Sequence, residues 1–414
     1  MRRRIQIALF VCLSIMLSAR LNDAVGQGVE ASFSQINSDS LISVYTKKMH
    51  KYMNKENKAS EVFSFTKDGI EVYQPATDTS SRKLESTFLW KNINDFKKAV
   101  YISDSQKNIR IALDPGHIAG DIETAKMEKK WVEMKNPPLQ LIEGELTLAT
   151  ANILKKKLEK EGATVMLTRD NPNQSSFGIE FKIWKDSLFI KSLDSAFSRG
   201  DVSFEENNFL RTKANDAEIF RRFFLTEDLR ERARKINAFN PDLTLIIHYN
   251  VDETNKNWNK PTKRNFNMVF VGGSFIQDEL DKPEARIDFL RQLLTDDIEQ
   301  SIDFSKHIIE SLVLKTGVPA ALDSNAVYLK SNCISTDAPG VFCRNLALTR
   351  MVKGTLCYGE SLYQDNINEC KALSKKDAST PLSLTNGIKT SKRVEEVAEG
   401  YFQGIMNYAK NKKK

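Results

Sequence analysis

The stretch Ile109-Arg-Ile-Ala-Leu-Asp-Pro-Gly-His117 joins an apolar run to a proline–glycine turn and a histidine. Two further runs also end in a polar residue, Leu243-Thr-Leu-Ile-Ile-His248 and Thr355-Leu-Cys-Tyr-Gly-Glu360. Short apolar runs of this kind are typical of buried strands. The carboxyl ends of parallel strands in an open α/β sheet meet at one crevice. We therefore expect His117, His248 and Glu360 to lie close together.

From about residue 108 onward, apolar runs alternate with segments of helical periodicity. Strands are predicted over 109–114, 164–168, 243–247, 267–271 and 355–358, and helices over 146–158, 229–239, 301–314 and 392–409. This alternation predicts an α/β fold with a mainly parallel, twisted sheet flanked by helices. Two segments without the alternation, about 171–228 and 274–300, are predicted to be long insertions.

The N-terminal part of the chain has a different texture. Three arginines at 2–4 precede an apolar stretch over 5–19 that is too short to span a membrane, which is typical of a signal peptide. We expect a signal over 1–26, cut after Ala19 or Gly26, with an uncleaved anchor as the alternative. Residues 27–107 are predicted to form a small α+β region of unassigned role, and 108–414 the catalytic domain. An exported protein of the periplasm or cell envelope is expected.

The net charge excludes one class of partner. The formal charge is +7, and removing residues 1–26, which hold four arginines and one aspartate, leaves +4. Spread over the whole chain, this is a mild bias and not the basic patch of a nucleic-acid-binding protein. It favours a polyanionic partner such as a cell-wall polymer.

The cysteines that follow the predicted signal lie close together in the sequence. They are Cys333, Cys343, Cys357 and Cys370. In an oxidising compartment such a set suggests one or two disulfides of undetermined pairing. Cys357, on a predicted central strand, could equally be a small buried thiol.

Two histidines and a carboxylate form an established ligand set for catalytic zinc, with the fourth position left open. His117 and His248 supply the imidazoles. Glu143 and Glu145 both precede the helix at 146–158, where an acidic residue also suits the helix dipole. From spacing alone either of them could be the third ligand. Asn250, two residues after His248, could support a ligand through an outer hydrogen bond.

Seven blocks of the chain, in order between about 108 and 410, resemble the zinc-dependent N-acetylmuramoyl-L-alanine amidases of the type 3 class. The blocks are Ile111-Ala-Leu-Asp-Pro-Gly-His117, Glu143-Gly-Glu-Leu-Thr-Leu-Ala149, Val165-Met-Leu-Thr-Arg169, Leu229-Arg-Glu-Arg232 through Ile236-Asn237, Leu245-Ile-Ile-His248-Tyr-Asn250, Leu356-Cys-Tyr-Gly-Glu360-Ser-Leu-Tyr363 and Val397-Ala-Glu-Gly-Tyr-Phe-Gln-Gly-Ile405.

The resemblance implies a role for each of these positions. Zn²⁺ would be held by His117, Glu143 and His248, and Glu360 would be the catalytic acid–base. The bond cut would be the amide between N-acetylmuramic acid and L-alanine in peptidoglycan, in wall remodelling or daughter-cell separation. Arg169, Arg232 and Asn250 are candidates for binding substrate or supporting the ligands. For the two arginines we favour a structural role, with Arg232 paired between sheet and helix and Arg169 capping a strand.

The chain also departs from the family pattern. Ile118-Ala-Gly120 stands where the family has a second glycine just after the histidine, and Gly359 replaces a usual aliphatic residue before Glu360. The segment between His117 and Glu143 is longer than usual. Some relatives block their zinc with an inserted helix, so 274–300 could be a lid that a protein activator displaces. A surface segment that supports the groove is the equal alternative.

Two other functions are compatible with these residues. One is a zinc metallopeptidase acting on wall peptides, and the other is an inactive module that binds peptidoglycan. The products released from purified sacculi would separate the three.

Overall fold

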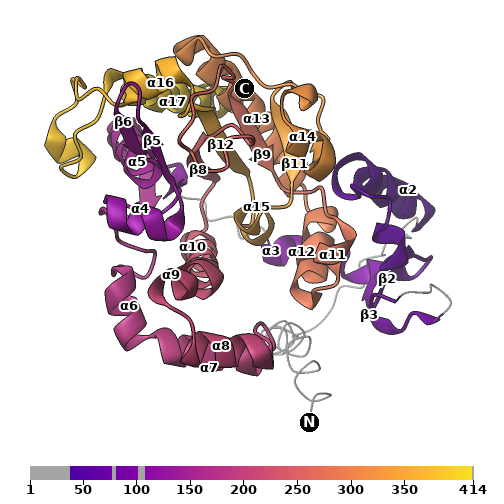
Figure 1. Ribbon diagram of the computed structural model, residues 1–414. Coiled ribbons are helices and arrows are strands. Elements are labelled where there is room, and N and C mark those ends of the chain that lie inside the picture. Colours follow the sequence, from indigo (N-terminus) through magenta and orange to yellow (C-terminus); the bar gives the residue numbers. More distant parts are fainter. Residues whose placement is uncertain (1–37, 77–80, 101–107, 413–414) are drawn as a thin grey trace. The chain divides into compact units, whose positions relative to one another are not determined.

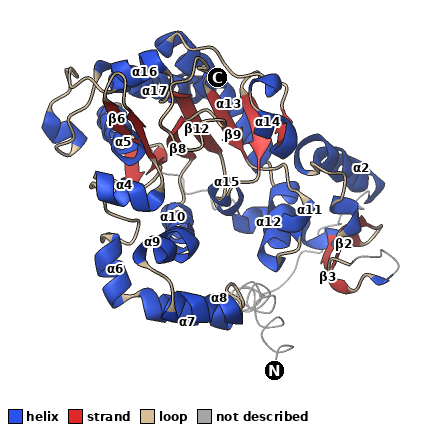
Figure 2. Cartoon of the chain, viewed as in Figure 1, coloured by secondary structure: helices blue, strands red, loops and turns tan. Residues whose placement is uncertain are grey.

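Buried apolar strands of this chain pair into one central sheet. The computed structural model describes residues 38–76, 81–100 and 108–412, so the predicted signal at 1–26 lies outside the described residues. The sheet has seven strands, in the order β10 (Cys333–Ser335), β11 (Val341–Arg344), β9 (Met268–Val271), β12 (Leu356–Tyr363), β8 (Leu243–Asn250), β4 (Arg110–Pro115) and β7 (Thr164–Leu167) (Figures 1 and 2).

Most neighbours in this sheet run parallel, as predicted. The exceptions are β9, which runs antiparallel to β12, and the edge strand β10, which runs antiparallel to β11. In the parallel pair of β12 and β8, Glu360 lies level with His248. The predicted convergence of these two strand ends is therefore confirmed.

Helices cover both faces of the sheet (Figure 1). One face packs on α5 (Glu143–Lys160), α13 (Asp297–Thr316) and α17 (Lys392–Lys412) through residues such as Leu113, Leu245 and Ile247. The other face packs on α10 (Leu225–Phe239) and α15 (Ala347–Met351) through Ala112, Ile246 and Leu356. Because strand side chains alternate between faces, Asp114, His248 and Glu360 project on the side of α10 and α15.

The remaining elements lie outside this core. The N-terminal region consists of α2 (Ser38–Lys48), η1 (Met49–Met53), β1 (Phe63–Phe65), β2 (Gly69–Tyr73), β3 (Leu84–Leu89) and α3 (Ile93–Val100). Strand β4 is followed by α4 (Ile122–Glu128) and by a hairpin of β5 (Trp131–Met134) and β6 (Leu139–Ile142). Nearer the C-terminal end are α14 (Val327–Asn332) and α16 (Ile367–Leu373). The α+β character predicted for the N-terminal region is confirmed in its described part, where β1 and β2 form an antiparallel hairpin after α2. The hairpin gains a third strand, β3, which the sequence did not indicate.

The first insertion is helical. It contains α6 (Phe181–Ser187), α7 (Phe189–Arg199), α8 (Phe204–Thr212), α9 (Asp216–Ile219) and η5 (Phe220–Phe224). These helices bury an aromatic cluster of their own around Trp184 and Phe224, whose ring centroids lie 4.7 Å apart. The cluster reaches the sheet's crevice through Ile118, the residue after His117.

The second insertion is not placed to act as a lid. It forms α11 (Gln277–Leu280) and α12 (Pro283–Leu294) and follows β9. Because β9 is antiparallel to β12, the C-terminal end of β9 lies at the opposite end of the strands from His248. Phe289 stacks on Phe63 with ring centroids 4.3 Å apart, and Arg286 pairs with Glu85. The segment 274–300 therefore packs against the N-terminal region and away from the crevice, which argues against a lid, and a protein activator stays a prediction.

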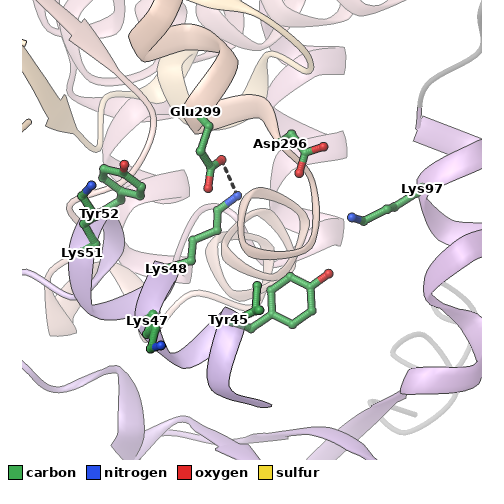
Figure 3. A pocket seen from close by; sticks show the side chains of 9 residues that line it. Tyr45, Lys47, Lys48, Lys51, Tyr52, Lys97, Asp296 and Glu299 are labelled. Atoms are coloured by element: carbon green, nitrogen blue, oxygen red, sulfur yellow. Dashed lines mark hydrogen bonds and ion pairs between the residues drawn. The ribbon is translucent and has the colours of Figure 1, made fainter. Parts of the chain in front are cut away.

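A pocket of about 250 Å³ lies between α2 and the start of α13 (Figure 3). At its centre Lys48 donates to Glu299 at 2.7 Å, and Lys47, Lys51 and Lys97 line its walls. None of the predicted catalytic residues borders this pocket. Its ion pair links α2 to the first turn of α13.

The cysteines correct another expectation. Cys333, Cys343, Cys357 and Cys370 are all buried and free. Cys333 and Cys343 lie on neighbouring strands, but the register pairs Cys333 with Arg344 and Cys343 with Ile334, so the two side chains point to opposite faces. The disulfides that the sequence suggested are therefore absent from the described residues, and the reading of Cys357 as a buried thiol is confirmed.

Gly359 provides the room for a buried tyrosine next to the crevice. A Cβ atom at this position would lie 2.1 Å from the hydroxyl oxygen of Tyr401, which hydrogen-bonds Ser361 at 2.7 Å. We expect Gly359→Ala to lower the free energy of unfolding by about 1–3 kcal/mol through overpacking, measured by urea unfolding. Adding Tyr401→Phe, which removes the nearest atom, should recover part of the loss. Equal losses in the single and double variants would contradict this explanation.

Candidate metal centre

Three metal-capable side chains from distant parts of the sequence meet at one point. His117 follows β4, Glu143 begins α5, and His248 lies in β8. One donor atom from each, an imidazole nitrogen or a carboxylate oxygen, lies within 4.8 Å of the others. These are the three ligands implied by the sequence, and within the described residues they form the only cluster of this kind.

Glu143 stands at the centre of the cluster. Its Oε1 lies 3.3 Å from Nε2 of His117 and 3.1 Å from Nδ1 of His248, and it also accepts the backbone N–H of Tyr249. The alternative ligand Glu145 does not belong to the cluster. The atoms that converge are therefore one oxygen and two nitrogens.

The position of the His248 ring depends on its neighbours. A Cβ atom on Gly116 would lie 2.2 Å from the ring, so the glycine leaves the space that the imidazole fills. On its other face the ring stacks on Tyr358, with centroids 4.7 Å apart and planes 6° from parallel. The His117 ring meets it edge-on at 4.7 Å. These contacts fix the two rings relative to each other.

Two buried arginines hold the turn that carries His117. Arg232 donates to the carbonyl oxygens of Pro115 and His117 and forms ion pairs with Asp114 and Asp228. Arg169 donates to the carbonyl oxygens of Pro115, Gly116 and Gly144, which ties the turn to the first residues of α5. Both side chains are buried and have protein partners, which fits a role in positioning and not a clamp on substrate.

The charges of the cluster interact strongly. Burial alone would raise the pKa of Glu143, but the two neighbouring imidazoles hold it well below its usual value. Burial lowers the pKa of His248 to about 4, against the opposing effect of Glu143. For His117 burial acts in the same direction, but Glu143 and Glu128 outweigh it and raise the pKa. Glu143 is thus an anion between two imidazoles, as a cation ligand should be.

Glu360 lies beside this cluster, on the strand next to His248. Burial and the negative charge of Glu143 raise its pKa to about 7. Asn250 lies two residues beyond His248 on the same face, and its amide nitrogen is 3.3 Å from the hydroxyl oxygen of Tyr328. Within the described residues the hydrogen-bond partners of its side chain are Met268, Tyr328 and Val251, and the outer hydrogen bond expected between Asn250 and a metal ligand is not among them.

Sequence reasoning missed two residues of the site. Glu128, at the end of α4, accepts a hydrogen bond from Nδ1 of His117 at 3.0 Å, and no motif or spacing marked it. Tyr358 packs on His248. The alternation of strand side chains could have revealed it, because Tyr358 shares a face with Glu360 two residues later.

A sequence profile described as N-acetylmuramoyl-L-alanine amidase matches residues 111–390. This range is more than half of the chain and includes all four residues of the crevice. The chain belongs to the N-acetylmuramoyl-L-alanine amidase family. It is therefore an amidase, with peptidoglycan as its substrate. No curated protein matches it.

Solved amidase structures are similar to this chain over most of its length. The CwlD amidase of Clostridioides difficile, solved with the GerS lipoprotein, is 19% identical, with a TM-score of 0.38, and the match covers 73% of this chain and 100% of that one. AmiC2 of Nostoc punctiforme is 13% identical, with coverage of 73% and 97% and a TM-score of 0.38. Ami1 of Mycobacterium smegmatis is 14% identical, with coverage of 73% and 97% and a TM-score of 0.39.

The ion pairs of Arg232 should contribute strongly to stability. Replacing Arg232 by Met leaves Asp114 and Asp228 buried without a counter-charge, and we expect a loss of about 3–5 kcal/mol. Arg234→Met is the matched control, because this arginine of the same helix is 66% exposed and should change stability by about 0.5 kcal/mol or less. Guanidinium unfolding of both variants measures the difference. Similar losses in the two would show that the buried pairs contribute little.

Proposed function

We propose that this amidase is zinc-dependent, with His117, Glu143 and His248 as ligands and Glu360 as the general base. The observation that carries the proposal is the convergence of two imidazole nitrogens and one carboxylate oxygen within 4.8 Å. Two histidines and a glutamate are an established set for catalytic zinc, and three protein ligands leave one position open for water or substrate.

The donor set suits zinc better than the other common divalent cations. Mg²⁺ and Ca²⁺ prefer shells made of oxygen ligands, whereas two imidazoles suit zinc or another transition metal. Gly116 leaves the space in which His248 reaches the other two ligands, because any side chain there would displace the His248 ring. When bound, zinc would supply a Lewis acid that lowers the pKa of a water molecule and polarises the scissile carbonyl.

We propose that Glu360 moves the proton in this reaction. As a carboxylate it can accept the proton of the attacking water and then deliver it to the departing nitrogen of L-alanine. Its pKa of about 7 lies near neutral pH, where such a group is efficient in both directions. The net reaction is the addition of water across the amide between the lactyl group of N-acetylmuramic acid and L-alanine.

The site of action that we propose is the cell envelope. Residues 1–26 have the pattern of a signal peptide, and the substrate lies outside the cytoplasmic membrane. Among the described helices, none is long and apolar enough to cross a bilayer. We propose that the enzyme remodels the wall or separates daughter cells after export.

The role of Glu360 can be tested by Glu360→Gln, which keeps the shape of the side chain and removes its basicity. We expect this variant to bind zinc like the wild type, measured by elemental analysis, and to release no stem peptide from purified sacculi, measured by mass spectrometry. Glu143→Gln should lose zinc and activity together. Glu145→Gln is the matched control on the same turn of α5 and should keep both.

The released products also separate the amidase from its competitors. Free stem peptides beside intact glycan strands are the expected result. Cut cross-links would instead show a peptidase, and binding without release would show an inactive wall-binding module. Undiminished release by Glu360→Gln would remove Glu360 from the mechanism.

The pH dependence should report on the same carboxylate. Because the base must be ionised, kcat/KM should fall about tenfold per pH unit below the pKa of Glu360. That pKa is about 7 in the metal-free protein, and a bound cation lowers it, so the acid limb should lie at or below this pH.

Replacing Lys130 should shift the acid limb of the kcat/KM profile. Its positive charge lowers the pKa of Glu360, so Lys130→Gln should shift the acid limb of kcat/KM to higher pH. Lys129→Gln, an exposed neighbour, is the control and should leave the limb in place. A limb that stays fixed in Lys130→Gln would mean that another group controls the rate.

A further inference from the structure

The carboxylate of Glu128 is buried against the candidate metal ligand His117. Its Oε1 accepts the hydrogen bond from Nδ1 of His117 at 3.0 Å. Its Oε2 accepts the backbone N–H groups of Ile118 and Ala119 at 3.1 and 3.2 Å. The side chain is only 2% exposed, so its charge is compensated by these three donors and not by water. A buried carboxylate with all its contacts on one histidine and the backbone after it has a specific structural purpose.

These contacts determine which ring nitrogen of His117 is available to bind a cation. A carboxylate can only accept, so Nδ1 carries a proton, and in the neutral ring Nε2 is then the nitrogen that has the lone pair. Nε2 is the atom that faces Glu143, at 3.3 Å. The hydrogen bond from Nδ1 of His117 to Glu128 thus selects the tautomer in which His117 can act as a ligand toward the cluster.

Glu128 also holds the backbone of His117 in an unusual conformation. His117 has a φ of +59°, in the left-handed region that non-glycine residues seldom adopt. Such a conformation persists where the surrounding structure enforces it. The two N–H groups that Glu128 binds belong to the next two residues, so they fix the backbone on the C-terminal side of the histidine, while Arg232 binds its carbonyl oxygen.

The helical insertion holds Glu128 in place. Helix α4 begins at the cap formed by Asp121 and ends next to Lys129, which adopts the left-handed conformation. Arg221 of η5 donates to the carbonyl oxygen of Met127 at 3.0 Å. Ile118 is fully buried in the aromatic cluster of the insertion, and Met127 packs against it. The insertion therefore contacts α4 on one side of Glu128 and the residue after His117 on the other.

We propose that Glu128 is a positioning residue that orients His117 and fixes its tautomer for metal binding, and that the insertion 171–228 supports it. This inference rests on the proposed zinc centre. Outer partners of this kind commonly change metal affinity by about 10–100-fold when removed. A carboxylate that served only to bind backbone N–H groups would affect folding and leave the affinity of the folded protein unchanged.

The test compares zinc affinities of the full chain, measured by competition with a chromogenic chelator. We expect Glu128→Gln to weaken zinc binding by about 10–100-fold, because the amide can donate to Nδ1 and so favour the wrong tautomer. Glu123→Gln, an exposed position of the same helix, is the matched control and should bind within about twofold of the wild type. The visible absorption of bound Co²⁺ should also change in Glu128→Gln only.

Thermal unfolding of the metal-free variants separates positioning from folding. If Glu128→Gln lowers the unfolding temperature but binds zinc like the wild type, the proposal is overturned. Should that variant fail to fold, Glu128→Asp keeps the charge, shortens the side chain, and is expected to weaken zinc binding by about tenfold or more. Wild-type affinity in Glu128→Asp would equally overturn it. Failure of the wild type itself to bind zinc would instead reject the proposed zinc centre.

Discussion

The buried ion pairs of Arg232 are the interaction on which the candidate centre depends. Asp114 at the end of β4 and Asp228 in α10 both pair with this guanidinium, and all three side chains are at most 2% exposed. Buried charges are costly unless they are paired and hydrogen-bonded. Here the other N–H groups of Arg232 bind the carbonyl oxygens of Pro115 and His117, so the charge and the turn stabilise each other. Arg169 binds the same turn and the start of α5, which brings His117 and Glu143 together although 26 positions separate them in the sequence.

Much of this arrangement could be predicted because it depends on local pattern. The apolar run before His248 forms a fully buried strand. Because side chains alternate along a strand, His248 lies on the same face as Ile246, two residues earlier. The same rule places Glu360 beside it, since parallel strands that end at one edge present equivalent positions. Spacing alone could not choose between Glu143 and Glu145. The structure distinguishes them, because Glu143 is the first residue of α5 and its oxygen contacts both imidazoles.

The parts that could not be predicted depend on contacts between distant segments. The run at 267–271 reads as a strand, but nothing in it reveals that β9 is antiparallel to β12, and this direction sends the following insertion away from the crevice. Proximity of Cys333 and Cys343 in the sequence suggested a bridge, yet the register of β10 and β11 places them on opposite faces. Glu128 belongs to a segment without a recognisable motif, and its role follows only from three hydrogen bonds made in the folded state.

The departure from the family pattern after His117 and the helical insertion are best explained together. A glycine at the position of Ile118 would have no side chain to bury. An isoleucine exposed at the crevice would instead present apolar surface to water. In this chain Ile118 is completely buried, and it belongs to the aromatic cluster of the insertion, which includes Trp184 and Phe220. The insertion in turn binds α4 through Arg221, and α4 delivers Glu128 to His117. Removing the insertion would therefore expose Ile118 and release Glu128 at once. The long segment between His117 and Glu143 and the insertion at 171–228 thus form one structural unit, whose contacts converge on the first histidine of the centre.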